Sequence, residues 1–160
     1  MTGTQNRDTH QHTARAAEPR RGGDAASAAP RPRVLVAEDH EDTRFMLRVF
    51  LEARGFEVVE AVNGEEALGL SESACPDLIL LDGSLPRLDG IGVASRIRAR
   101  ASSRRVPVVF LSGHAEPRAR SAAFAAGCDD YLTKPFELDR LCSVLARHLG
   151  DGAGPGGVSE

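Results

Sequence analysis

The sequence predicts an α/β domain in which a parallel sheet is covered by helices on both faces. Short apolar runs alternate with amphipathic stretches five times between residues 33 and 149, and this alternation is typical of parallel strands joined by helical crossovers. The run at 78–81 is apolar at every position, as expected of a strand buried on both faces.

The first half of this segment is expected to hold three strands and two helices. The strands are predicted from their apolar runs at 33–37, 56–60 and 78–81. Between the first two strands, Leu47 and Leu51 belong to an apolar face with helical spacing, so we expect a helix over 41–54 that ends at Gly55. A turn at Asn63 leads into a second helix near 65–72.

The second half continues the same alternation. We expect helices near 91–100, 117–126 and 136–149, with strands at 106–111 and 130–132. Pro117 suits the first turn of its helix, and Gly127 suits the end of it. The predicted sheet therefore has five strands, and each is followed by a helix.

Composition defines the flanks and excludes several classes of protein. Residues 1–32 contain no aromatic residue and no apolar periodicity, which predicts a disordered arm, and the glycine-rich segment 150–160 predicts a flexible tail around a folded part at 33–149. The chain has no apolar run long enough for a membrane span or a secretory signal, so we expect no membrane contact. Three cysteines without CxxC spacing suit a cytoplasmic location. The net charge of −3 gives no indication of direct nucleic-acid binding.

Polar residues stand where four of the predicted strands end. Glu38 and Asp39 follow the first strand, Asp82 the third, Ser112 the fourth and Lys134 the fifth. The carboxyl ends of parallel strands meet at one edge of an open sheet, where such folds place their functional crevice. Lys134 is the only lysine among twenty basic residues, so an ammonium at this one place favours a functional role.

Three clustered carboxylates repel one another unless a cation lies among them. Mg²⁺ is the natural candidate, since it prefers hard oxygen ligands and shares phosphate oxygens. A carboxylate beside Mg²⁺ and an ammonium can attack a phosphoryl group. The cluster therefore indicates phosphoryl transfer to an aspartate.

Four motifs resemble the receiver domain of bacterial two-component response regulators. They lie in order at residues 34–40, 77–90, 108–114 and 130–136, and the resemblance covers 33–149. It implies a flavodoxin-like (βα)5 three-layer sandwich with a parallel five-stranded sheet in the order 2-1-3-4-5.

The resemblance implies a phosphorylation site and a metal site. Asp82 stands at the phosphoacceptor position. Asp39 matches the acid that binds Mg²⁺ directly, Glu38 matches its neighbour that holds a metal-bound water, and the backbone carbonyl of Ser84 matches a further ligand. Asp82 itself completes the metal set.

The resemblance also implies a switch. Ser112 matches the switch hydroxyl, and Lys134, before a cis-prone bond to Pro135, matches the lysine that contacts the phosphoryl group. Tyr131 matches the switch aromatic that turns inward when the hydroxyl is recruited.

A single-domain response regulator is therefore the expected function. A sensor histidine kinase or a histidine phosphotransfer protein would phosphorylate Asp82, and the face of the fourth helix, fifth strand and fifth helix would change. Only flanks lie outside 33–149, so we expect output by contact with a downstream protein, by phosphoryl relay or by homodimerisation. No enzymatic activity is expected beyond the chain's own phosphotransfer and slow autodephosphorylation.

Two alternatives belong to other classes. A phosphatase of the haloacid-dehalogenase type also uses an aspartate and Mg²⁺, but it has a second aspartate where Ser84 stands. A pseudo-receiver that takes no phosphoryl group is the second alternative.

Side chains near these motifs have simpler interpretations. His40 and His114 are expected to face solvent. The basic cluster Arg98, Arg100, Arg104 and Arg105 is expected to be a solvated helix end favoured by the helix dipole.

Overall fold

The computed structural model describes residues 30–100 and 105–150. Most of the predicted arm at 1–32 and of the predicted tail at 150–160 lies outside the described residues, as does Arg104. Within them, no helix is both long and apolar enough to cross a bilayer.

Five parallel strands form one sheet in the order β2-β1-β3-β4-β5. The strands are β1 (Arg33–Ala37), β2 (Glu57–Ala61), β3 (Leu78–Asp82), β4 (Val108–Ser112) and β5 (Asp130–Thr133). The predicted strand number, direction and order are confirmed.

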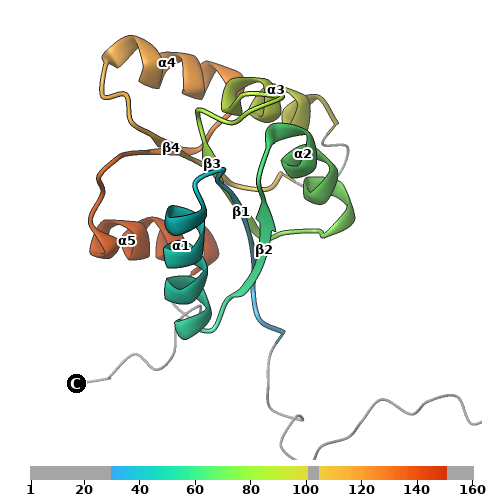
Figure 1. The fold of residues 1–160 in the computed structure, drawn as a ribbon, viewed down its shortest axis with the longest axis vertical. Helices are drawn as coiled ribbons and strands as arrows, with labels where there is room; N and C mark the ends of the chain where they lie inside the picture. The colour runs from blue at the N-terminus through green and yellow to red at the C-terminus, as the bar shows by residue number, and fades with distance from the viewer. Residues whose placement is uncertain (1–29, 101–104, 151–160) are drawn as a thin grey trace, which may run out of the picture. The chain divides into compact units, whose positions relative to one another are not determined.

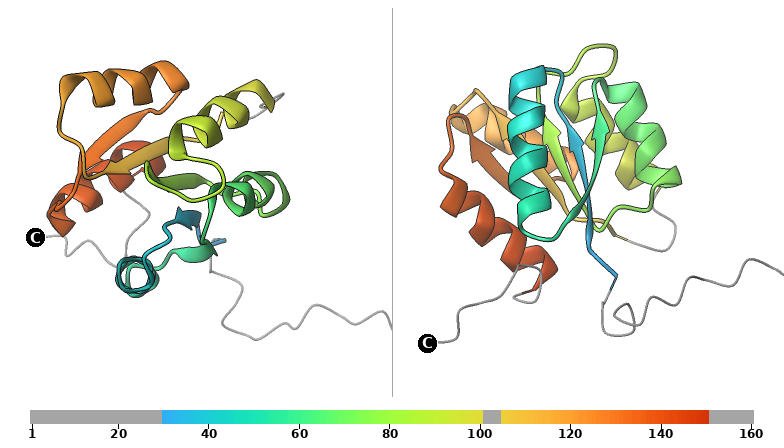
Figure 2. Two further views of the ribbon diagram at one scale, coloured as in Figure 1. Left: turned by 45° about the horizontal axis from the view of Figure 1, so that its top comes forward. Right: turned by 60° about the horizontal axis from the view of Figure 1, so that its bottom comes forward.

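Five helices alternate with the strands and cover both faces of the sheet (Figures 1 and 2). They are α1 (Glu41–Ala53), α2 (Gly64–Ser73), α3 (Gly90–Arg100), α4 (Pro117–Ala126) and α5 (Leu138–Leu149). α1 and α5 lie on one face, and α2, α3 and α4 lie on the other (Figure 2).

The alternation of side chains along each strand divides the core into two halves. Leu35, Ile79 and Phe110 face the layer of α2, α3 and α4, whereas Val36 and Leu80 face the layer of α1 and α5. All five side chains are buried. A strand with an apolar layer on each face must be apolar throughout, and this explains the unbroken apolar run of β3.

The strand boundaries differ slightly from those predicted. Phe56 precedes β2 and donates its N–H to Leu51 O of α1, 3.1 Å away, so it closes the helix end and does not join the ladder. β4 begins at Val108, after Pro107, which has no N–H to give to a ladder. Asp82 and Ser112, which the sequence placed after their strands, are the last residues of β3 and β4.

Arg98 corrects one expectation. Its guanidinium donates to Val106 O and Gly127 O, both at 2.8 Å, and to Asp129 Oδ2 at 2.5 Å. The side chain is only 17% exposed. Arg98 therefore fastens the end of α3 to the segments that lead into β4 and β5, and a solvated helix end is the wrong description of this residue.

Candidate functional site

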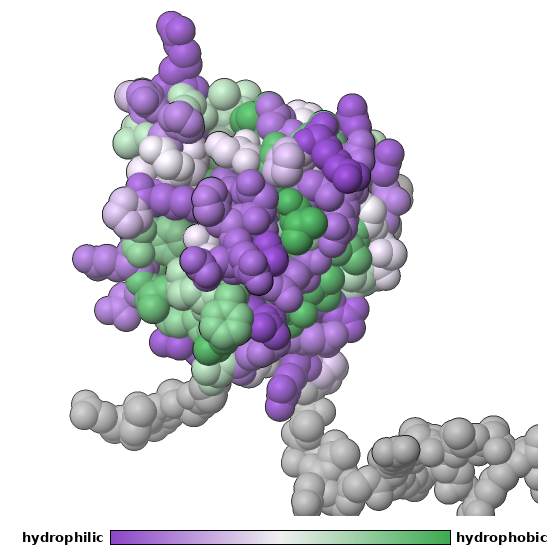
Figure 3. All heavy atoms as spheres, viewed as in Figure 1, coloured by the Kyte–Doolittle hydropathy of each residue, from purple (hydrophilic) through white to green (hydrophobic). Residues whose placement is uncertain are grey.

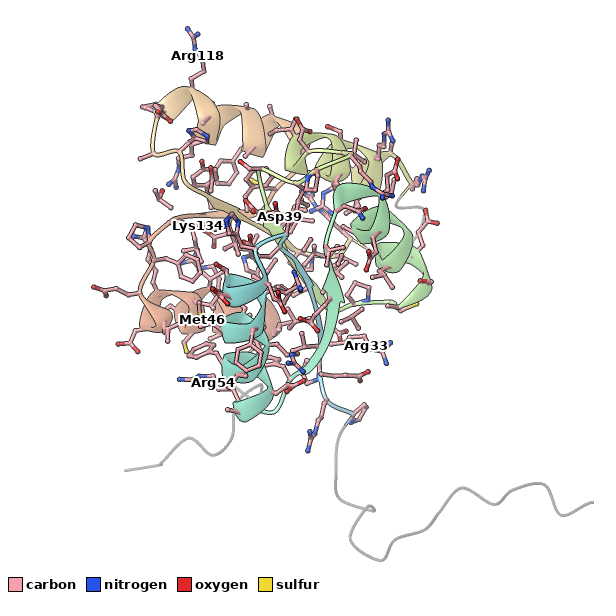
Figure 4. The ribbon with its side chains drawn as sticks, viewed as in Figure 1. Arg33, Asp39, Met46, Arg54, Arg118 and Lys134 are labelled. Atoms are coloured by element: carbon pink, nitrogen blue, oxygen red, sulfur yellow. The ribbon has the colours of Figure 1, made fainter. Side chains whose placement is uncertain are left out.

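Lys134 joins two acidic side chains at the carboxyl edge of the sheet. Its Nζ lies 2.6 Å from Glu38 Oε2 and 3.4 Å from Asp82 Oδ2. Glu38 follows β1, Asp82 ends β3 and Lys134 follows β5, so the contacts join the ends of three strands. Figure 4 shows Lys134 at the same end of the sheet as Asp39, which precedes α1.

Glu38 is held in a fully buried position. Its side chain is 0% exposed, and Oε1 accepts the N–H of His40 at 3.1 Å while Oε2 accepts from Lys134. Burial raises the pKa of the Glu38 carboxyl above its ordinary value; the Lys134 hydrogen bond opposes the rise, and the charge of Asp82 adds to it. The site therefore keeps a carboxylate in an environment that disfavours its charge.

Asp82 is almost as buried, at 4% exposure. The N–H of Ser84 donates to Asp82 Oδ1 at 3.1 Å, which leaves Oδ2 facing Lys134. The loop after β3 closes tightly over this residue, since a Cβ on Gly90 would lie 2.6 Å from the Asp82 carbonyl oxygen. The Asp82 carboxylate is thus oriented by a backbone donor on one side and an ammonium on the other.

Ser112 and Tyr131 both contact the main chain of His114. The N–H of His114 donates to Ser112 Oγ at 3.1 Å, and the Tyr131 hydroxyl donates to His114 O at 2.6 Å. Tyr131 is buried and stacks on Phe110, its register partner in β4, with ring centroids 6.0 Å apart. The predicted hydroxyl and aromatic residue are therefore linked through one residue of the β4–α4 loop.

A second acidic cluster lies at the rim of the site. Glu38, Asp39 and His40 offer ligand atoms that all lie within 4.8 Å of one another. The predicted metal set also contains Asp82, which Lys134 Nζ joins to Glu38. His40 is exposed, as expected, but its ring lies beside the two acids.

Arg44 is a positioning residue that the sequence interpretation missed. Its Nη1 donates to Glu38 O at 3.0 Å and to Asp39 O at 3.4 Å, and its Nε lies 3.4 Å from Glu60. These bonds hold the main chain of the acidic pair. A cation in the first turn of a helix opposes the helix dipole. This unfavourable placement could have indicated that Arg44 has a tertiary role.

The residues present fit a Mg²⁺ ion. Glu38, Asp39 and Asp82 supply carboxylate oxygens, and Lys134 is the ammonium that contacts Glu38 and Asp82. Three carboxylates against one ammonium leave an excess of negative charge, part of which is buried. Hard oxygen donors with uncompensated negative charge are the environment that Mg²⁺ prefers.

The matching family model is that of the response regulator receiver domain, and it matches residues 34–146. The chain therefore belongs to the receiver domain family of response regulators, which are two-component signalling proteins.

Two curated relatives are transcriptional regulators. The phosphate regulon transcriptional regulatory protein PhoB of Rhizobium meliloti is 39% identical over 118 residues, which cover 74% of this chain and 52% of the relative. The transcriptional regulatory protein PrrA of Mycobacterium tuberculosis is 44% identical over 125 residues, covering 76% and 53%. The chain thus spans about half the length of these relatives.

One solved structure bears on the metal. The receiver domain of a sensor histidine kinase of Pseudomonas aeruginosa superposes with a TM-score of 0.70 at 33% identity, covering 76% of this chain and 99% of that one. That structure is described as having a magnesium ion coordinated in its active site cleft.

Proposed function

We propose that Asp82 accepts a phosphoryl group from phosphohistidine on a sensor histidine kinase or a histidine phosphotransfer protein, in a Mg²⁺-dependent reaction. The observation that carries this proposal is the placement of the Lys134 ammonium within 3.4 Å of the buried Asp82 carboxylate. The membership in the receiver family supports the same conclusion.

Asp82 is the nucleophile of the proposed reaction. One of its carboxylate oxygens forms a bond to phosphorus as the bond from phosphorus to the histidine nitrogen breaks. The transition state spreads negative charge over the equatorial phosphoryl oxygens. Lys134, already beside Asp82 Oδ2, neutralises part of that charge.

The metal ion would be held by Asp39, Asp82 and the backbone carbonyl of Ser84, with Glu38 contacting a metal-bound water. When bound, Mg²⁺ supplies positive charge that offsets the acidic cluster and the incoming phosphoryl oxygens. The N–H of Ser84 already ties its loop to Asp82 Oδ1, which supports a role for the carbonyl of the same residue.

Ser112 and Tyr131 form the proposed switch. The Ser112 hydroxyl oxygen now accepts a hydrogen bond from the His114 N–H. To donate to a phosphoryl oxygen on Asp82, the hydroxyl turns away from this N–H. Because Tyr131 holds the carbonyl of His114, a change at this residue reaches the aromatic ring in β5. The face of α4, β5 and α5 then binds a downstream protein differently.

The surface next to the site suits a protein donor. α1 exposes the apolar side chains Phe45 and Val49, which are 56% and 48% accessible. Figure 3 shows apolar residues at the surface around α1, set among hydrophilic ones. A cytoplasmic location, output by protein contact and dimerisation on phosphorylation stay predictions from the sequence.

The test is intact mass measured after incubation with acetyl phosphate and Mg²⁺. We expect one added phosphoryl group on the wild type, and none on Asp82→Asn or after chelation of the metal. Asp89→Asn is a matched control, because Asp89 is an exposed carboxylate of the same loop that caps α3 through Gly92 N–H.

Three results would contradict the proposal. A phosphoryl group that persists on Asp82→Asn would place the acceptor elsewhere. No adduct on rapid quenching, together with no beryllofluoride binding, would make the chain a phosphate-independent interaction module. Rapid turnover of phosphate monoesters would instead indicate the phosphatase alternative.

A further inference from the structure

His40 lies at the rim of the acidic site with its ring turned toward two carboxylates. Its Nδ1 is 3.8 Å from Glu38 Oε1 and 3.8 Å from Asp39 Oδ1. These separations are longer than a hydrogen bond, so the imidazole is bonded to neither acid. The His40 side chain is 80% exposed and that of Asp39 is 35% exposed, whereas that of Glu38 is buried.

The backbone fixes the position of His40 between Glu38 and α1. His40 occupies the N-cap position of α1, yet its side chain makes no capping hydrogen bond. Its N–H donates to Glu38 Oε1, and its carbonyl accepts the first helical hydrogen bond from Arg44. The main chain of His40 is thus fixed to Glu38 on one side and to α1 on the other.

The two carboxylate oxygens of Glu38 have different partners. Oε2 is engaged by the ammonium at 2.6 Å, whereas Oε1 is the oxygen that faces His40. The rim cluster of Glu38 Oε1, Asp39 Oδ1 and His40 Nδ1 therefore presents two oxygens and one nitrogen that share no salt bridge with Lys134 in the described residues.

The chemistry of this donor set differs from that of an all-oxygen magnesium site. Imidazole suits Zn²⁺, Co²⁺ and Ni²⁺, whereas Mg²⁺ favours oxygen and water. The 3.8 Å from His40 Nδ1 to each acid oxygen fits either coordination geometry after a small shift of the exposed ring, so the preference for a transition ion follows from the nitrogen donor.

We propose that His40 is a nitrogen ligand that allows the rim cluster to bind a borderline divalent transition ion through Glu38, Asp39 and His40. This inference rests on the metal site of the proposed function and adds a specificity-determining residue to it. A transition ion bound there would share Glu38 and Asp39 with Mg²⁺, so the two metals would compete. His40 would thereby set which ion occupies the site.

Co²⁺ is the probe, and its binding to the full chain is followed by calorimetry and by visible absorption. His10 and His12, two residues apart, could bind the same ion, so every protein in the series carries His10→Gln and His12→Gln. The test variant adds His40→Asn. The matched control adds His114→Asn, since His114 is another exposed histidine near the site, paired with Glu116.

We expect His40→Asn to weaken Co²⁺ binding by at least about tenfold, because losing a ligand costs no less than losing an outer-shell partner of one. The absorption band of bound Co²⁺ and a paramagnetically shifted imidazole proton signal should change with it. Mg²⁺ affinity should stay within about twofold, as oxygen ligands dominate its binding. His114→Asn should alter none of these quantities.

The outcomes separate this inference from the proposed function. Equal Co²⁺ affinity in the parent and in His40→Asn, with Mg²⁺ still bound, overturns the role of His40 and leaves the magnesium site intact. Equal weakening by His114→Asn also overturns it. Failure of the parent to bind either ion overturns both the inference and the metal requirement of the proposed function.

Discussion

The ammonium of Lys134 lies 2.6 Å from the carboxylate of Glu38, across 96 positions of sequence. Glu38 is fully buried, whereas Lys134 is 27% exposed. The pair therefore has unequal partners, because only the acid has lost its contact with water. Removing one partner of a buried ion pair usually destabilises a protein, because it leaves the other charge unpaired. Lys134 is partly exposed and keeps Asp82 Oδ2 at 3.4 Å as a second acidic partner, so this penalty is small here.

Glu38→Gln is expected to stabilise the protein at pH 7, because the amide removes the charge that burial disfavours. The pKa of Glu38 is raised above its ordinary value of 4.5, so the folded state binds this proton more tightly than the unfolded state does. The resulting stabilisation is fully present below pH 4.5 and is lost as pH rises through the raised pKa. Glutamine cannot ionise, so the advantage of the variant should be largest at neutral pH and vanish below 4.5.

The measurement is the free energy of urea unfolding at several pH values. Glu57→Gln is the control, because Glu57 forms an ion pair with Arg33 in which both side chains are well exposed, and such pairs contribute little. A Glu38→Gln protein less stable than the wild type at pH 7 would mean that the Lys134 contact outweighs the burial of the charge.

Arg98→Met is expected to lower the free energy of unfolding by about 2–4 kcal/mol. The substitution removes donors from Val106 O, Gly127 O and Asp129 Oδ2. Arg98→Lys should recover less than half of the loss, because one ammonium cannot reproduce the planar fork of the guanidinium.

Arg100→Met is the matched control for Arg98. Arg100 lies two residues further along α3 and pairs with Glu72, but both side chains are more than half exposed. Its loss should change the free energy of unfolding by less than about 0.5 kcal/mol. Similar losses from Arg98 and Arg100 would show that the Arg98 contacts add nothing beyond a surface ion pair.

The contacts of Arg98 could not be predicted from the sequence, although the strands could. The strands were predictable because each is a short apolar run, and the polar residues at their ends follow from parallel topology. Arg98 donates hydrogen bonds to residues 29 and 31 positions away. No local sequence pattern indicates contacts between residues so far apart in the chain. The sequence interpretation relied on the helix dipole, which applies to Arg100 but not to a side chain enclosed between two loops.

The candidate site likewise contains residues that the sequence predicts and contacts that it does not. Lys134, Asp82 and Ser112 were predictable because they stand at strand ends, and the only lysine of the chain is conspicuous. The position of the His40 main chain depends on its N–H bond to Glu38 Oε1, and the Tyr131–His114 contact depends on the path of the β4–α4 loop. Both are tertiary facts that residue spacing does not encode.

Gly64→Ala is expected to destabilise the protein by about 1–3 kcal/mol and to weaken Mg²⁺ binding. A Cβ at Gly64 would lie 1.7 Å from Leu88 O, and the Gly64 N–H donates to Pro86 O at 3.2 Å. The start of α2 therefore packs directly on the loop after β3, which carries Ser84. An added methyl group must push this loop away, and the displacement reaches the proposed metal site.

Gly69→Ala, one turn and a half along the same helix, has the opposite expectation. No atom lies within 4 Å of a Cβ built there, so alanine should stabilise α2 by about 0.5–1 kcal/mol through its better helix propensity. Urea unfolding and Mg²⁺ calorimetry on both variants test the pair. Unchanged Mg²⁺ affinity in a folded but destabilised Gly64→Ala protein would show that the loop after β3 moves without disturbing the metal ligands, because the Ser84 N–H bond to Asp82 then holds the site independently of α2.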